Sequence, residues 1–131
     1  VHGVSDVQHL CIRENHSINR ADRSLNAKIG IDEKGNPVIL NLHEKKDGPH
    51  GIVAGMTGSG KSELLLTLVL SIACFYSPQE VQFAFVDFKG GGLADQLKSL
   101  PHTAGVLSNL DERHFDKALS SFTRIYSLIP V

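Results

Sequence analysis

Residues 55–62 form the stretch of this sequence with the clearest chemical pattern. Gly55, Gly60, Lys61 and Ser62 satisfy the spacing G-x-x-x-x-G-K-[ST], which is typical of a phosphate-binding loop. Backbone N–H groups can surround the β- and γ-phosphates of a nucleotide only where side chains leave the approach open, and glycine leaves it open. The predicted binding residues are Gly55, Met56, Thr57, Gly58, Ser59, Gly60, Lys61 and Ser62.

Two side chains of this loop have predicted roles of their own. Lys61 can reach the β/γ-phosphate oxygens, and the Ser62 hydroxyl can ligate Mg²⁺. The alternative is a glycine-rich turn that merely contains a lysine. A dinucleotide fingerprint, G-x-G-x-x-G, is not met because Glu63 stands where its last glycine belongs.

The segments around the loop predict how it is held. "IVA", residues 52–54, is typical of a short and fully buried strand, and residues 61–76 of a helix that is apolar on nearly every face. "VQFAFVD", residues 81–87, predicts a second buried strand. Two buried strands joined by a helix make a right-handed βαβ unit with a parallel sheet.

Further elements are expected on both sides of this unit. A β-hairpin is predicted over residues 27–42, with its turn at Gly35 and Asn36. After Asp87, "FKGGG" predicts a flexible corner, "LADQLKSL" a short helix ended by Pro101, and "AGVL" a third strand. An amphipathic helix is expected from Asp111 onward.

Composition limits the classes of protein to consider. The 131 residues are 41% hydrophobic and 21% charged, which predicts one folded domain or part of one. A net charge of -1 gives no general attraction to nucleic acid. We expect Cys11 and Cys74 to be free thiols, and we expect neither a membrane-spanning segment nor a signal peptide in the sequence given.

Three longer motifs resemble one family of motor ATPases. They are "LNLHE" followed by "GPHGIVAGMTGSGKSELL", then "DFKGGG", then "LPH" followed by "NLD". Together they resemble the FtsK/SpoIIIE family, and most closely its branch of EssC-type ATPases of bacterial type VII secretion. Residues from about 25 to 111 carry the resemblance, although Met56 stands where the family usually has threonine.

The resemblance implies a fold, a cofactor and an assembly. The fold would be a three-layer α/β phosphate-loop NTPase of the RecA/ASCE kind with a mostly parallel sheet and an N-terminal β-hairpin, truncated at the C-terminus. Residues 1–24 would be a linker or short helix, and residues 25–131 the N-terminal part of the ATPase domain. The full protein would bind ATP and Mg²⁺ at subunit interfaces of a homo-oligomeric ring, at the cytoplasmic face of a membrane reached only through regions outside this sequence.

The catalytic acidic pair of the family is not recognisable in this sequence. Asp87 closes an apolar strand and could face Mg²⁺, or it could be a structural strand end. Asp111 and Glu112 form an acidic pair, but Asn109 and Glu112 have the spacing of a helix-opening capping box, which is the favoured interpretation. By the resemblance, Lys89 and the glycines 90–92 could contact a neighbouring subunit or line a central pore; the alternative is a flexible corner with a solvated lysine.

Three functional hypotheses follow. The favoured one is the ATP-binding module of a motor that exports polypeptides by type VII secretion. The second is the ATPase domain of a translocase acting on double-stranded DNA. The third is a fragment that binds nucleotide without hydrolysing it, because the acidic pair is missing.

Overall fold

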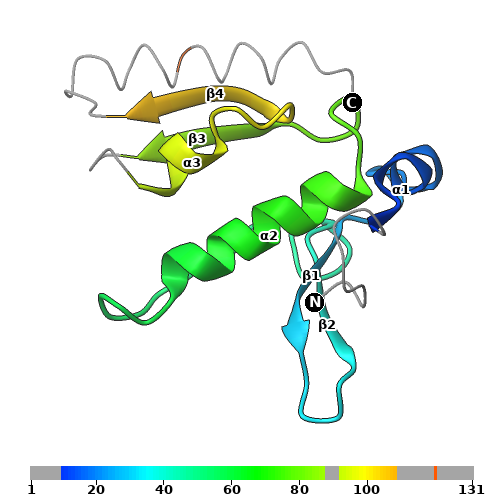
Figure 1. Ribbon diagram of the computed structural model, residues 1–131, viewed down its shortest axis with the longest axis horizontal. Coiled ribbons are helices and arrows are strands. Elements are labelled where there is room, and N and C mark those ends of the chain that lie inside the picture. Colours follow the sequence, from blue (N-terminus) through cyan, green and yellow to red (C-terminus); the bar gives the residue numbers. More distant parts are fainter. Residues whose placement is uncertain (1–9, 88–91, 109–119, 121–131) are drawn as a thin grey trace. The chain divides into compact units, whose positions relative to one another are not determined.

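The computed structural model describes residues 10–87, 92–108 and 120. Its contacts divide the chain into two compact units, Val1–Gln82 and Phe83–Val131. None of the helices in the described ranges is long and apolar enough to cross a membrane. In chain order the elements are α1 (Ile12–Ile18), β1 (Asn26–Ile31), β2 (Pro37–Asn41), α2 (Lys61–Phe75), β3 (Phe83–Asp87), α3 (Leu93–Leu97) and β4 (Thr103–Ser108) (Figure 1).

The predicted hairpin is confirmed. β1 and β2 pair antiparallel, with Ala27 opposite Leu40. The turn between them closes on Asp32, whose Oδ1 accepts the backbone amides of Lys34 (2.9 Å) and Asn36 (2.8 Å). Gly35 adopts φ 83°, a left-handed conformation that suits glycine.

The long helix after the loop is also confirmed, although it is less covered than expected. α2 packs against β1 and α1, and its buried residues lie in its C-terminal half. Leu64 and Leu70 remain about 40% exposed, so the described residues do not cover every apolar face of this helix. The reason is that the hairpin and α1 are the main described partners of α2. The core of this unit comprises Ala27, Val69, Ser71, Ile72, Ala73 and Tyr76.

The second unit holds the other two predicted strands. β3 and β4 pair in parallel, with Ala84 opposite Gly105, so both strands and their parallel direction are confirmed. The predicted full burial of β3 is not observed, because its residues alternate between half-buried and exposed. The short helix α3 contacts both strands and buries Ala94 and Leu97. Thr103 Oγ1 donates to the Leu97 carbonyl at 2.6 Å, which ties the end of α3 to the start of β4.

The predicted strand at residues 52–54 is wrong. These residues are not in a strand, and the Ile52 side chain is 96% exposed. A strand needs a hydrogen-bonded neighbour, and the described strands pair only as β1–β2 and β3–β4. The βαβ unit built on this strand therefore does not form among the described residues.

The sheets observed are two small ones, the first antiparallel and the second parallel. The three-layer arrangement with a mostly parallel sheet stays a prediction. Several predicted features lie outside the described residues: Lys89, Gly90 and Gly91, the possible capping box at Asn109 and Glu112, and the helix expected from Asp111.

Candidate functional site

The predicted phosphate loop is curled. The Ser59 amide donates to the Met56 carbonyl at 3.1 Å, which closes a tight turn. Gly58 and Gly60 have φ angles of 81° and 88°, in the left-handed region where a side chain would be strained. The glycines at these positions therefore have a conformational reason that does not depend on a ligand.

Lys61 folds back over the start of the same loop. Its Nζ donates to the carbonyls of Gly55 (2.6 Å) and Met56 (2.7 Å). A Cβ on Gly55 would lie 2.6 Å from Ser59 Oγ, so the loop approaches itself closely there. The structure thus brings together Gly55, Met56, Ser59 and Lys61.

The loop leads directly into the N-terminus of α2. Gly60 is the N-cap residue, and its carbonyl accepts the first helical bond from the Leu64 amide at 2.9 Å. Ser62 lies exposed on the first turn. The N–H groups of a first helical turn have no partner within the helix and carry a partial positive charge, so they attract an anion.

Asp87 belongs to a different unit from the loop. It ends β3 opposite Ser108 in the unit Phe83–Val131, whereas the loop belongs to the unit Val1–Gln82. A Cβ on Gly92 would lie 3.2 Å from Asp87 Oδ2, so the chain returns close to this carboxylate. In the described part of the chain no group of three or more His, Cys, Asp and Glu side chains is arranged to hold a metal ion.

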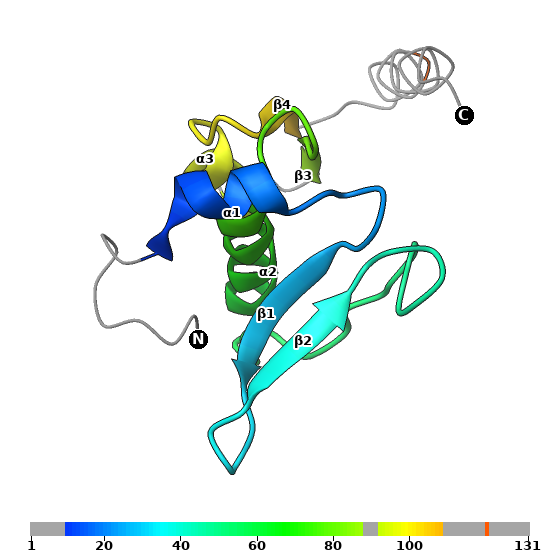
Figure 2. The ribbon, with the colours of Figure 1, turned by 90° about the vertical axis from the view of Figure 1, so that its right-hand side faces the viewer.

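Side chains that the sequence did not single out lie at the opposite end of α2. Asn15 Nδ2 donates to the Cys74 carbonyl (3.4 Å), His16 Nε2 lies 2.9 Å from the Ala73 carbonyl oxygen, and Asn19 Nδ2 donates to the Phe75 carbonyl (3.0 Å). α1 accordingly lies beside the C-terminal end of α2 (Figure 2). No local pattern could have revealed these bonds, because each joins residues more than 50 positions apart.

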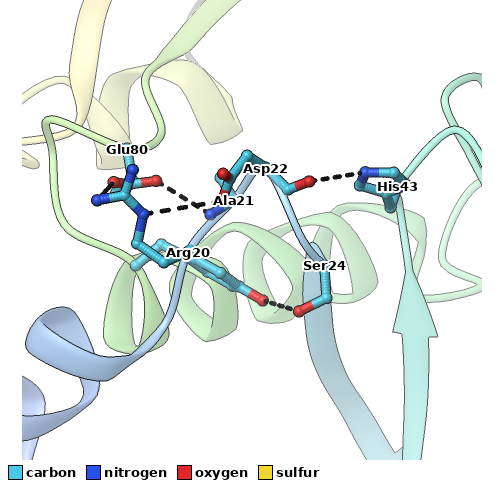
Figure 3. A network of polar contacts seen from close by, with 7 residues as sticks. Arg20, Ala21, Asp22, Ser24, His43 and Glu80 are labelled. Atoms are coloured by element: carbon cyan, nitrogen blue, oxygen red, sulfur yellow. Dashed lines mark hydrogen bonds and ion pairs between the residues drawn. The ribbon is translucent and has the colours of Figure 1, made fainter.

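Polar contacts continue along the segment that joins α1 to β1 (Figure 3). Glu80 accepts the Ala21 amide at 3.0 Å and pairs with the Arg20 guanidinium at 3.2 Å. The Tyr76 hydroxyl, at the end of α2, accepts the Asn26 amide at 2.9 Å. The residues between α1 and β1 are therefore hydrogen-bonded and ion-paired to Tyr76 and Glu80, which follow α2.

A family model built from related sequences matches most of the chain. The FtsK/SpoIIIE model covers residues 10–123. The chain belongs to the FtsK/SpoIIIE family. The resemblance seen in its motifs is thereby confirmed.

Three curated FtsK/SpoIIIE relatives are secretion proteins by name. The ESX secretion system protein EccC of Geobacillus thermodenitrificans is 52% identical over 70% of this chain, and the ESX secretion system protein YukB of Bacillus subtilis 42% over 82%. The type VII secretion system protein EssC of Staphylococcus aureus is 40% identical over 92%. The chain spans only 6%, 7% and 8% of these proteins, respectively.

A solved structure shares the fold. The cytoplasmic domain of the type VII secretion ATPase EccC from Thermomonospora curvata matches 95% of this chain and 14% of its own, with a TM-score of 0.71 and 34% identity. The fold is therefore that of part of an FtsK/SpoIIIE ATPase, in agreement with the predicted α/β phosphate-loop class.

Proposed function

We propose that this chain is the ATP-binding module of an FtsK/SpoIIIE-type motor ATPase that powers protein export by type VII secretion. The observation that carries the proposal is the curled loop at the N-terminus of α2, with Lys61 folded over it. Family membership supports the same assignment.

The geometry of the loop suits a triphosphate. Residues 51–60 are all exposed, and nothing lies within 4 Å of where a Cβ would stand on Gly58 or Gly60. A polyanion can therefore approach the backbone amides, and its oxygens can replace the carbonyls of Gly55 and Met56 as partners of Lys61. Charge-assisted bonds to phosphate are stronger than bonds to neutral carbonyls, so this exchange favours binding.

We propose Ser62 as a Mg²⁺ ligand at the loop, and Asp87 stays a prediction as a Mg²⁺ carboxylate. The hydroxyl of Ser62 is exposed at the start of α2, and a hydroxyl oxygen is a ligand that Mg²⁺ accepts. Asp87 would serve through its carboxylate. When bound, the ion neutralises negative charge on the phosphates.

Transport of a secreted polypeptide is preferred over transport of double-stranded DNA. The relatives described above are named for secretion, and a net charge of -1 provides no general attraction to the DNA backbone. We further propose that the full protein forms a homo-oligomeric ring at the cytoplasmic face of the membrane, to which regions outside this chain connect it.

Titration with a fluorescent ATP analogue and Mg²⁺ tests the assignment of Lys61. Lys61→Ala should weaken binding by about 1.5–3 kcal/mol, or roughly tenfold to 150-fold, because it removes a charge-assisted phosphate contact. Lys45→Ala removes an exposed lysine from another loop and is the matched control, with no change expected. Equal affinity of Lys61→Ala and the unchanged chain would refute the proposal.

A further inference from the structure

The C-terminal end of α2 lacks the local features that usually close a helix. Its last internal bond runs from the Tyr76 amide to the Ile72 carbonyl, and the carbonyls of residues 73–75 come after it. The C-cap Tyr76 is extended, with φ -119° and ψ 144°, and Ser77 follows it, so the left-handed glycine that ends many helices is missing. The last turn also has no basic side chain. Partners for these carbonyls therefore come from water or from elsewhere in the chain.

Residues 10–24, which we call the capping segment, supply such partners. The side chains of Asn15, His16 and Asn19 each reach a different carbonyl among residues 73–75. These carbonyls carry the partial negative charge of the helix end, and the amide groups of the two asparagines donate to them. Beyond the helix end, the Glu80 carboxylate forms an ion pair with the Arg20 side chain and accepts a hydrogen bond from the Ala21 amide.

The capping segment is held mainly by polar contacts, which suits reversible attachment. α1 has no buried residue, and the Ile18 side chain is 75% exposed. With seven residues, α1 is too short to be stable as an isolated helix. Its helical form therefore depends on the bonds that it makes to α2.

We propose that the capping segment is a detachable C-terminal cap of the phosphate-loop helix, and that Asn15 and Asn19 are positioning residues for ATP binding. One helix joins the cap at its C-terminal end to the phosphate loop at its N-terminal end. Helix formation is cooperative, so loss of the cap raises fraying along α2. ATP requires an ordered first turn and binds the capped form better.

Linkage makes this coupling reciprocal. If the cap raises affinity for ATP, then ATP must stabilise attachment of the cap by the same factor. This coupling rests on the proposed function, whereas the capping of α2 does not. A movement of the region that precedes the capping segment in the full protein would therefore change the affinity for ATP by attaching or detaching this segment.

The test compares Asn15→Ala/Asn19→Ala with the control Ser17→Ala. Ser17 lies on the same helix, but its hydroxyl donates to the Glu14 carbonyl within α1. Asn19→Asp, nearly equal in size, places a negative charge against the Phe75 carbonyl and serves if the double variant does not fold. Titration with the fluorescent ATP analogue and amide hydrogen exchange, with and without ATP and Mg²⁺, are the two measurements.

We expect the double variant or Asn19→Asp to lose affinity by at least about fivefold, the lower end of usual coupling, while Ser17→Ala binds as the unchanged chain does. ATP should slow exchange at residues 12–19 of the unchanged chain. Unaltered affinity in a folded variant whose α1 exchanges faster would overturn the coupling.

If the unchanged chain does not bind ATP, the proposed function fails, and the cap is then tested by amide exchange in α2 alone. Faster exchange in the variants than in the unchanged chain supports the cap. Equal exchange refutes it.

Discussion

At the scale of single residues, Gly48 marks a place where the chain comes very close to itself. A Cβ on this residue would overlap the backbone carbonyl of Leu42. Gly48→Ala should lower the free energy of unfolding by about 1–3 kcal/mol, because backbone must shift to make room. Urea unfolding measures the loss, with Gly51→Ala as the control, since nothing lies within 4 Å of a Cβ there. Equal midpoints for the two variants would contradict this account.

The two cysteines should differ in reactivity. Both are free, Cys11 is exposed, and Cys74 is half-buried on α2. Burial raises the pKa of the Cys74 thiol, which lowers its thiolate fraction at a given pH. With a thiol-specific reagent at about pH 8 we expect Cys11 to react first and Cys74 slowly. Cys11→Ser should remove the fast phase and Cys74→Ser the slow one. The reverse result would show that burial does not control this chemistry.

At the scale of elements, a side chain of α2 accepts a hydrogen bond from the backbone of β1. Ser71 is fully buried, and its Oγ accepts the Lys28 amide at 2.8 Å, next to the register shift between Lys28 and Gly30. Ser71→Ala should cost about 1–3 kcal/mol, because it leaves the Lys28 amide unsatisfied. Ser17→Ala, which alters an exposed hydroxyl, should cost much less. Urea unfolding gives the loss, and faster exchange of the Lys28 amide should accompany it.

The hairpin turn should weaken in acid. Bonds from the side chain and the backbone amide of Asn36 lower the pKa of Asp32, with smaller contributions from the backbone amides of Lys34 and Gly35. The carboxylate form is thus favoured in the folded turn. Its stabilising effect is complete above the ordinary carboxyl pKa of about 4 and is lost as the pH falls through the lowered value.

Asp32→Asn separates this effect from general acid unfolding, because the amide keeps an acceptor oxygen but does not titrate. We expect amide exchange in residues 26–41 to speed up in the unchanged chain below about pH 4, relative to the variant. Identical pH profiles for the two proteins would exclude Asp32 as the titrating group.

Elements with a complete local pattern could be predicted from the sequence. The hairpin, α2, β3, α3 and β4 each combine an apolar run with breakers such as Gly35 or Pro101. The strand expected at residues 52–54 could not be judged locally, because it depends on a pairing partner. The cap of α2 was also beyond a local pattern, since Asn15 and Asn19 meet carbonyls more than 50 residues away.

At the scale of the whole molecule, charge argues against DNA as a partner of this chain. The net charge is -1 over 131 residues. Fluorescence anisotropy with a labelled duplex should therefore show no salt-dependent binding between about 50 and 200 mM salt. Tight binding at low salt that falls steeply with added salt would instead favour the DNA translocase hypothesis.

The candidate site was predicted in part. The spacing of Gly55, Gly60 and Lys61 predicts a phosphate loop, and the curled backbone agrees with the conformation that such a loop needs. The position of Asp87 relative to this loop depends on how the two units pack, which no local pattern encodes. Residue types thus define the loop, whereas tertiary packing decides what faces it.

The exposed apolar residues just before and at the start of the loop have a practical consequence for the purified protein. Ile52 and Met56 are 96% and 83% exposed, and no described strand pairs with this stretch. Exposed aliphatic side chains next to backbone that has no strand partner favour aggregation. Concentrated solutions of the isolated chain should therefore scatter more light than dilute ones, and Ile52→Lys should keep them clear.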